Sequence, residues 1–160
     1  MNTLKPPMGM TLDDTVMTKN LFAYGTLMCE DIMLAVTGQR FSRNAGFLRD
    51  YQRRRIKGEV YPGLIPKPGG IVEGIVYRDV SDAAWDLLDA FEGEMYQRQI
   101  VRVSIEDSTS LEAHTYVIRP EFKDRLGSGE WDFEKFLRRG KKTFEGRYAG
   151  FKALKNSRRT

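Results

Sequence analysis

A single carboxylate, that of Glu92, is the best candidate for chemistry in this chain, because the sequence predicts that it lies at the end of an amphipathic helix. The helix is expected over residues 82–91, with Ser81 as its N-cap and Gly93 as the glycine that ends it. At about 100° per residue its apolar side chains form one stripe: Ala84, Trp85, Leu87, Leu88 and Phe91. Glu92 points with this stripe, and away from the side that carries Asp82, Asp86 and Asp89.

A carboxylate held against apolar groups has its pKa raised, which suits it to act as a general base. A second interpretation stays open, in which Glu92 reaches sideways to Arg98 in an ordinary ion pair. Two other carboxylates are weaker candidates. Glu94 follows the glycine that ends the helix and Glu73 alternates in a strand, so both are expected at the surface.

The second candidate is a turn formed by Tyr24-Gly25-Thr26-Leu27, where a strand expected over residues 21–24 gives way to a helix expected over residues 29–37. Backbone N–H groups at such a junction are not all used by the strand or the helix, so they can bind an anion or a developing oxyanion. Gly25 allows a tight turn and a close approach of a ligand to the backbone. Taken alone, such a turn is more often a plain connection than a site, and it lacks the spacing of a phosphate-binding P-loop.

The elements that position these groups indicate an α+β fold with a small, strongly curved or barrel-like mixed sheet and flanking helices. Residues 61–70 are expected to form a turn region, because prolines and glycines punctuate them. Strands are expected over residues 21–24, 47–51, 71–77, 99–105 and 111–118. The last helix is expected over residues 133–144. One domain is expected over residues 20–152, with flexible termini at 1–19 and 153–160.

The composition narrows the classes of function. The chain has 160 residues, of which 41% are hydrophobic and 30% charged, as in a soluble globular domain. Apolar runs are too short to cross a membrane, and residues 1–20 lack the apolar core of a signal peptide, so a cytoplasmic location is expected. With one cysteine, Cys29, and one histidine, His114, the chain has few ligands for a metal cluster and no good candidate for a Ser-His-Asp triad.

The net charge of +4 raises a further possibility, an interaction protein that binds an acidic partner. Its basic groups would be the cluster Arg53-Arg54-Arg55 and the tail over residues 153–160. Both basic segments are explained equally well as ordinary charged surface exposed to solvent. No recognised nucleic-acid motif accompanies them. Neither nucleic acid nor membrane is therefore expected as a partner, and the oligomeric state is left open.

Several motifs, in this order and spacing, resemble the gamma-glutamylcyclotransferase-like family, and within it the branch of avirulence-induced-like proteins and gamma-glutamylamine cyclotransferases. The resemblance covers roughly residues 20–150. The motifs are Tyr24-Gly25-Thr26-Leu27, Tyr61-Pro62-Gly63-Leu64, Val72-Glu73-Gly74-Ile75-Val76-Tyr77, Phe-Glu-Gly-x-x-Tyr-x-Arg over residues 91–98, Thr115-Tyr116-Val117 and Trp131-Asp132-Phe133-Glu134.

The resemblance implies an enzyme that releases 5-oxoproline and a free amine from a small gamma-glutamyl compound, without metal or cofactor. It implies that Glu92 is the proton acceptor and that residues 24–27 hold the gamma-glutamyl group. Tyr96, Arg98 and Tyr116 are further pocket candidates, although a structural brace or a core position explains them as well. Two alternatives remain: a catalytically silent binding module on the same fold, and removal of a gamma-glutamyl protecting group from a biosynthetic intermediate.

Overall fold

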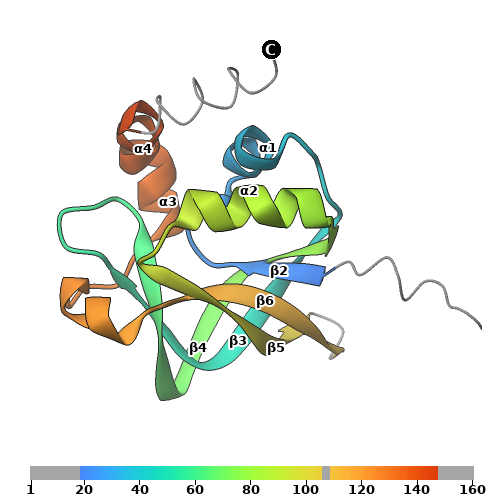
Figure 1. The fold of residues 1–160 in the computed structure, drawn as a ribbon. Coiled ribbons are helices and arrows are strands. Elements are labelled where there is room, and N and C mark those ends of the chain that lie inside the picture. Colours follow the sequence, from blue (N-terminus) through green and yellow to red (C-terminus); the bar gives the residue numbers. More distant parts are fainter. Residues whose placement is uncertain (1–18, 106–108, 148–160) are drawn as a thin grey trace, which may run out of the picture.

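The computed structural model describes residues 19–105 and 109–147, in which five strands close into a barrel (Figure 1). The strands are neighbours in the order β2-β4-β3-β5-β6, and β6 returns to β2. The β2–β6 pairing, with Leu21 beside His114, is parallel, and the other pairings are antiparallel. The strands are β2 (Lys19–Ala23), β3 (Arg43–Arg55), β4 (Pro62–Val80), β5 (Tyr96–Ile105) and β6 (Ser110–Ile118). The expected α+β class with a barrel-like mixed sheet is confirmed.

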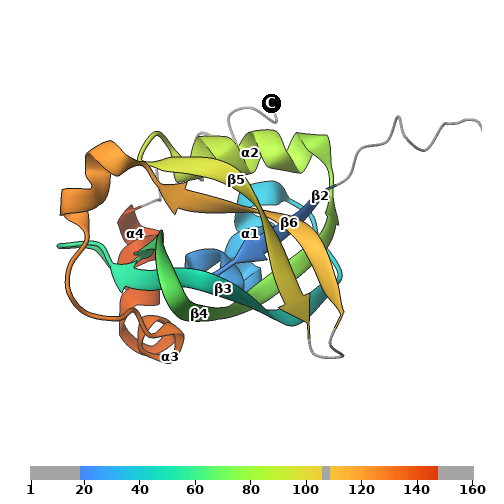
Figure 2. The same ribbon diagram turned by 90° about the horizontal axis from the view of Figure 1, so that it is seen from below.

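The helices gather mainly on one side of the barrel, where α1, α2 and α4 lie above the strands in Figure 1 and behind them in Figure 2. One apolar core fills the space between these helices and the sheet, and a second core is formed by side chains from all five strands of the barrel. The helical segments are η2 (Thr26–Met28), α1 (Glu30–Thr37), α2 (Asp82–Glu92), η3 (Pro120–Arg125), α3 (Phe133–Lys135), η4 (Phe136–Gly140) and α4 (Lys141–Arg147).

Helix α2 has the boundaries that its sequence predicts. The Ser81 hydroxyl accepts a hydrogen bond from the Ala84 N–H at 3.3 Å, which caps the first turn. At the other end Gly93 adopts a φ of 78°, and its N–H donates to the Asp89 carbonyl at 3.1 Å. Glu92 is therefore the last residue of the helix, with a side-chain direction fixed by helical geometry.

The turn region expected over residues 61–70 is wrong, because β4 runs through it and pairs with β3 almost from end to end. The ladder has an irregularity that holds Pro68: Arg49 pairs with Ile71 and Tyr51 with Pro66, so residues 67–70 lie opposite Asp50 alone. Pro62 and Pro66 are paired within the ladder, opposite Arg55 and Tyr51. The same pairing makes β3 much longer than the expected strand over residues 47–51.

Two other boundaries differ from expectation. Strand β2 begins at Lys19, inside the segment expected to be flexible, and ends at Ala23, so Tyr24 belongs to the turn. The helix expected over residues 133–144 is divided into α3, a π-helical segment and α4. The rest of the expected flexible termini, 1–18 and 153–160, lies outside the described residues. Within the described ranges no helix is long and apolar enough to span a membrane.

Candidate active site

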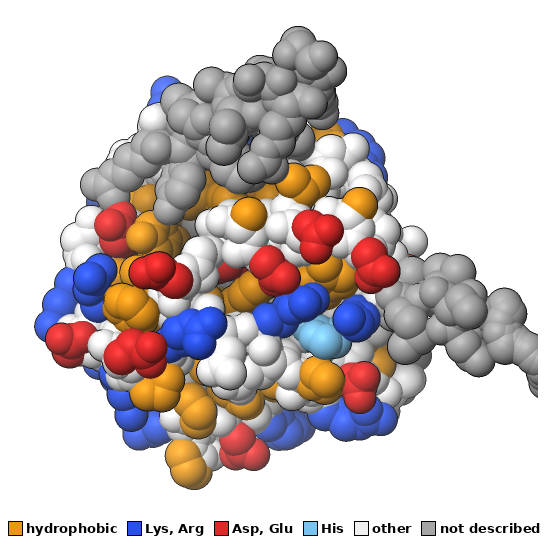
Figure 3. All heavy atoms as spheres, viewed as in Figure 1, with side chains coloured by type: hydrophobic (Ala, Val, Ile, Leu, Met, Phe, Trp, Pro, Cys, Tyr) orange, Lys and Arg blue, Asp and Glu red, His pale blue; other side chains and the backbone are white. Residues whose placement is uncertain are grey.

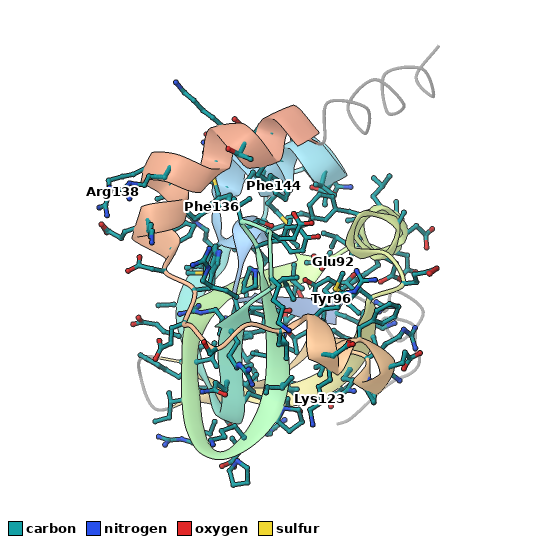
Figure 4. The ribbon with its side chains drawn as sticks, turned by 90° about the vertical axis from the view of Figure 1, so that its left-hand side faces the viewer. Glu92, Tyr96, Lys123, Phe136, Arg138 and Phe144 are labelled. Carbon is teal, nitrogen blue, oxygen red and sulfur yellow. The ribbon has the colours of Figure 1, made fainter. Side chains whose placement is uncertain are left out.

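Glu92 and the 24–27 turn line the same cavity, although they are more than sixty residues apart in the sequence. The cavity measures about 70 Å³. A water molecule occupies roughly 10–15 Å³ on this measure, so the inner part of the cavity has room for a small group. The cavity is partly open to solvent, so a longer ligand can extend out of it. Figure 4 shows the Glu92 and Tyr96 side chains close to each other between α2 and the barrel. The structure thus brings together the two candidates that the sequence suggested separately.

The carboxylate of Glu92 sits in surroundings that favour its protonated form. Glu92 is half-buried at the end of α2, and burial is the main cause that raises its pKa from 4.5 to about 8. The nearby charge of Asp89 adds to the rise. Within the described residues Glu92 has no ion pair and no hydrogen bond that would stabilise its charged form.

The alternative ion pair between Glu92 and Arg98 is wrong, because Arg98 is engaged elsewhere. Its Nη2 lies 3.4 Å from Oδ2 of Asp89, and its guanidinium carbon lies 4.5 Å from the centre of the Trp85 ring. Figure 3 shows the same surface, where acidic side chains along α2 face a row of basic side chains and the single histidine below them. Arg98 therefore braces this junction and does not line the cavity.

The 24–27 turn supplies backbone N–H groups to the cavity. Residues 26–28 form one turn of 3₁₀ helix, in which the carbonyls of Gly25 and Thr26 accept hydrogen bonds from Met28 and Cys29 at 2.9 and 3.1 Å. In the described part of the chain no acceptor binds the N–H groups of Gly25, Thr26 or Leu27. Unused donors beside a cavity are suited to hold an anion or an oxyanion.

Gly25 lies where a side chain would not fit. A Cβ atom at this position would stand 2.9 Å from two ring carbons of Pro62, which also lines the cavity. The glycine is therefore needed for the close packing of the turn against the start of β4.

Three hydrogen bonds fix the turn to the barrel. The Tyr24 hydroxyl donates to the Tyr116 carbonyl at 2.6 Å, and the Tyr77 hydroxyl donates to the Leu27 carbonyl at 2.7 Å. Nη1 of Arg53 donates to the Tyr24 carbonyl at 2.8 Å, so this arginine is more than a solvated surface charge. The pKa of Tyr24 is raised by burial and then by the Glu92 charge, which keeps its hydroxyl protonated as a donor.

Of the three further pocket candidates, Tyr96 and Tyr116 line the cavity and Arg98 does not. The Tyr96 hydroxyl donates to the Pro62 carbonyl at 2.8 Å. The Tyr116 hydroxyl donates to Oδ1 of Asp89 at 2.7 Å, and burial followed by this bond raises the pKa of Tyr116. Both tyrosines are buried, so their rings form fixed walls.

Sequence reasoning missed Asp89, which holds both Tyr116 and Arg98. Its position three residues before Glu92 was a usable signal, because residues three apart on a helix are neighbours. It also missed four further cavity residues: Tyr61, Phe91, Met95 and Phe144. The weaker carboxylates Glu73 and Glu94 are exposed, as expected. The described residues contain no group of three or more His, Cys, Asp or Glu side chains that could hold a metal ion.

Comparison with known proteins gives consistent matches. The family model described as "Gamma-glutamyl cyclotransferase, AIG2-like" matches residues 21–133. "AIG2-like protein D" of Arabidopsis thaliana is 34% identical over 127 residues, which cover 78% of this chain and 83% of the relative. A solution structure from Arabidopsis thaliana superposes with a TM-score of 0.65 at 30% identity, covering 89% of this chain and 95% of the other. An AIG2-like protein from Mus musculus superposes with a TM-score of 0.57 at 26% identity, covering 72% and 88%.

Proposed function

The chain belongs to the gamma-glutamyl cyclotransferase, AIG2-like family, and we propose that it is an enzyme that releases 5-oxoproline and a free amine from a gamma-glutamyl compound. One observation carries the proposal. A half-buried carboxylate without a described cationic partner, Glu92, shares a cavity with the unused N–H groups of the 24–27 turn. A binding module needs no such base. Burial of a carboxylate whose pKa is near 8 lowers the stability of the folded protein when the group is charged, so without a chemical role it brings only a loss.

The first step of the proposed reaction is a proton transfer. The α-ammonium group of a gamma-glutamyl compound has no lone pair, so it cannot attack until a base removes one proton. Glu92 takes this proton, and its pKa of about 8 makes it a much better acceptor than an ordinary glutamate with a pKa of 4.5. The product of this step is a neutral amine next to a protonated Glu92.

The second step closes a ring within one molecule. The amine nitrogen attacks the γ-carbonyl carbon, a C–N bond forms, and the carbonyl electrons move to the oxygen. The N–H groups of Gly25, Thr26 and Leu27 stabilise this oxyanion by hydrogen bonding. Since both reacting groups belong to one substrate, the protein mainly has to hold it in a folded conformation.

The third step breaks the bond to the leaving nitrogen. Glu92 returns its proton to that nitrogen, and the oxyanion collapses to a carbonyl as the C–N bond to the leaving nitrogen breaks. The ring nitrogen passes its extra proton to the departing amine, so 5-oxoproline and the amine, in its ammonium form, are released. The carboxylate is then ready for another cycle. As written, the reaction uses no metal and no cofactor, and the single cysteine of the chain suits a reducing cytoplasm.

The test is to incubate the protein with gamma-glutamyl amino acids, gamma-glutamyl-ε-lysine and glutathione, and to measure 5-oxoproline. Glu92→Gln keeps the size of the side chain but cannot take the proton, so turnover should fall by roughly 10² to 10⁴. Glu94→Gln is the matched control, because it removes one exposed negative charge two residues away. Binding of these compounds without any 5-oxoproline would instead indicate a silent binding module, and equal loss in both variants would refute Glu92 as the base.

A further inference from the structure

Beyond the polar groups assigned above, the cavity has an apolar wall formed by Tyr61, Phe91, Met95 and Phe144. The Phe144 ring meets the Phe91 ring edge-on at 6.0 Å between centroids, and the Tyr61 ring at 6.5 Å. Tyr61, Phe91 and Met95 are only half-buried, so they leave apolar surface open to the cavity. Accessible apolar surface beside a reactive carboxylate indicates a place for an apolar part of the substrate.

The charge of the cavity supports the same conclusion. Glu92 is the only ionisable acid or base that lines it among the described residues, apart from tyrosines. Arg53 and Arg98 do not line the cavity: Arg53 donates to the Tyr24 carbonyl and Arg98 pairs with Asp89. A leaving amine that carries its own carboxylate would therefore meet no compensating charge from the lining side chains, whereas a neutral apolar amine would meet the rings.

Phe144 reaches the cavity from a segment outside the residues that the family model matches. The match ends at residue 133, whereas Phe144 lies on α4, which spans Lys141–Arg147. Figure 4 shows Phe136 and Phe144 on the side of this segment that faces the barrel. Phe144 is 4% exposed, and its ring also meets Phe136 at 5.9 Å, so α4 holds it in a fixed position. Phe144 thus comes from a segment beyond the residues that the family model matches.

We propose that Tyr61, Phe91, Met95 and Phe144 form the subsite for the leaving amine, and that this subsite selects gamma-glutamyl amides of aromatic or bulky apolar amines. The inference rests on the proposed function, because it assigns the part of the cavity that the gamma-glutamyl group does not occupy. Phe144 is then a residue that determines specificity.

The test compares two neutral substrates that differ only in the leaving amine, gamma-glutamylbenzylamide and gamma-glutamylmethylamide. We expect kcat/KM to favour the benzylamide by about 10- to 100-fold, as for other apolar subsites that gain a hydrophobic group. Gamma-glutamyl-ε-lysine, whose leaving amine is long and charged, should fall well below the benzylamide.

Two variants test whether Phe144 is responsible for the preference for the benzylamide. Phe144→Leu keeps an apolar side chain in the core but removes the ring, so it should reduce the benzylamide preference by about threefold to tenfold. Leu137→Ala is the control, since Leu137 lies on the adjoining π-helical segment η4 and is 42% exposed. Thermal unfolding of both variants shows whether α4 remains folded, and the ratio of kcat/KM for the benzylamide to kcat/KM for the methylamide is compared among the two variants and the unmodified protein.

The outcomes separate the two proposals. Equal kcat/KM for both amides, or an equal loss for both in Phe144→Leu, overturns the aromatic subsite and leaves the proposed function standing. Turnover of other gamma-glutamyl compounds but of neither amide also overturns the subsite. If no gamma-glutamyl compound yields 5-oxoproline, the proposed function fails and the subsite falls with it.

Discussion

Replacing Glu92 by glutamine is expected to stabilise the protein at alkaline pH while it abolishes turnover. In the unfolded chain Glu92 has its ordinary pKa of 4.5, whereas in the folded protein burial raises that pKa to about 8. Below pH 4.5 both states hold the proton, and the folded protein pays no penalty. Between the two values the unfolded chain releases the proton and the folded protein keeps it, so stability falls as the pH rises. Above pH 8 the loss is complete.

The size of the effect follows from the same two pKa values. A difference of about 3.5 between them, at 1.36 kcal/mol for each pH unit, corresponds to an upper limit of about 5 kcal/mol. Glu92 is half-buried, so water reaches part of the residue and reduces this figure. We therefore expect the Glu92→Gln protein to be more stable than the unmodified protein by roughly 2 to 5 kcal/mol at about pH 9, and by almost nothing at about pH 4.

Urea unfolding of the unmodified protein, Glu92→Gln and Glu94→Gln at about pH 4, 7 and 9 measures these differences. The comparison between variants at one pH cancels every other group that titrates. Glu94 is exposed, so its variant should follow the unmodified protein throughout. If the stability curves of the unmodified protein and Glu92→Gln run parallel over this range, the carboxylate is not held in the surroundings described above.

Three further outcomes are expected. The kcat/KM of the unmodified protein should rise about tenfold for each pH unit and level off above about pH 8, because only the deprotonated fraction of Glu92, about a tenth at pH 7, can accept a proton. Asp89→Asn should move the midpoint of that profile to lower pH, because the charge of Asp89 helps to raise the pKa of Glu92; Asp86→Asn, exposed one turn earlier, should leave the midpoint unchanged. Gly25→Ala should lower turnover and should lower the free energy of unfolding by about 1–3 kcal/mol, because its Cβ would stand 2.9 Å from the neighbouring proline ring. A Cβ at Gly146 meets no atom within 4 Å, so Gly146→Ala is the control and should not destabilise the protein.

The sequence predicts those parts of the site that depend on local periodicity. The cap at Ser81, the end at Gly93 and the direction of Glu92 follow from one helix, and the structure agrees with all three. The 24–27 turn is also local, because it lies between a buried strand and a helix. Each of these features depends on residues within about four positions of one another, which is the range over which sequence patterns are informative.

The features that the sequence did not predict depend on distant partners. Residues 61–70 look like a turn until β3 is placed beside them, because Pro62 and Pro66 pair with that strand and only Pro68 lies in the bulge opposite Asp50. Asp89 looks like part of a solvated face until Tyr116, from β6, donates to it. Phe144 shows only helical spacing, and its place at the cavity depends on how α4 packs against Phe91 and Tyr61.

Barrel closure explains how the separate motifs become one site. The parallel pairing of β2 with β6 sets Leu21 beside His114. Further along the same direction, the hydroxyl of Tyr24, three residues after Leu21, reaches the carbonyl of Tyr116, two residues after His114. Tyr116 in turn reaches Asp89 on α2, one turn before Glu92. A continuous path of hydrogen bonds therefore joins the turn to the helix that carries the carboxylate.

The same hydrogen bonds and ion pair explain why Glu92 forms no ion pair with Arg98 of the neighbouring strand β5. Arg98, six residues after Glu92, would lower the pKa of Glu92 if the two formed an ion pair. Instead Asp89 holds one nitrogen of Arg98 at 3.4 Å, and the Trp85 ring covers its guanidinium. Asp89 thus has two effects of the same sign on Glu92, because it adds a negative charge nearby and holds Arg98 in an ion pair of its own. A base with a pKa near neutrality results from this arrangement, in which burial is the larger cause and the placement of Arg98 preserves it.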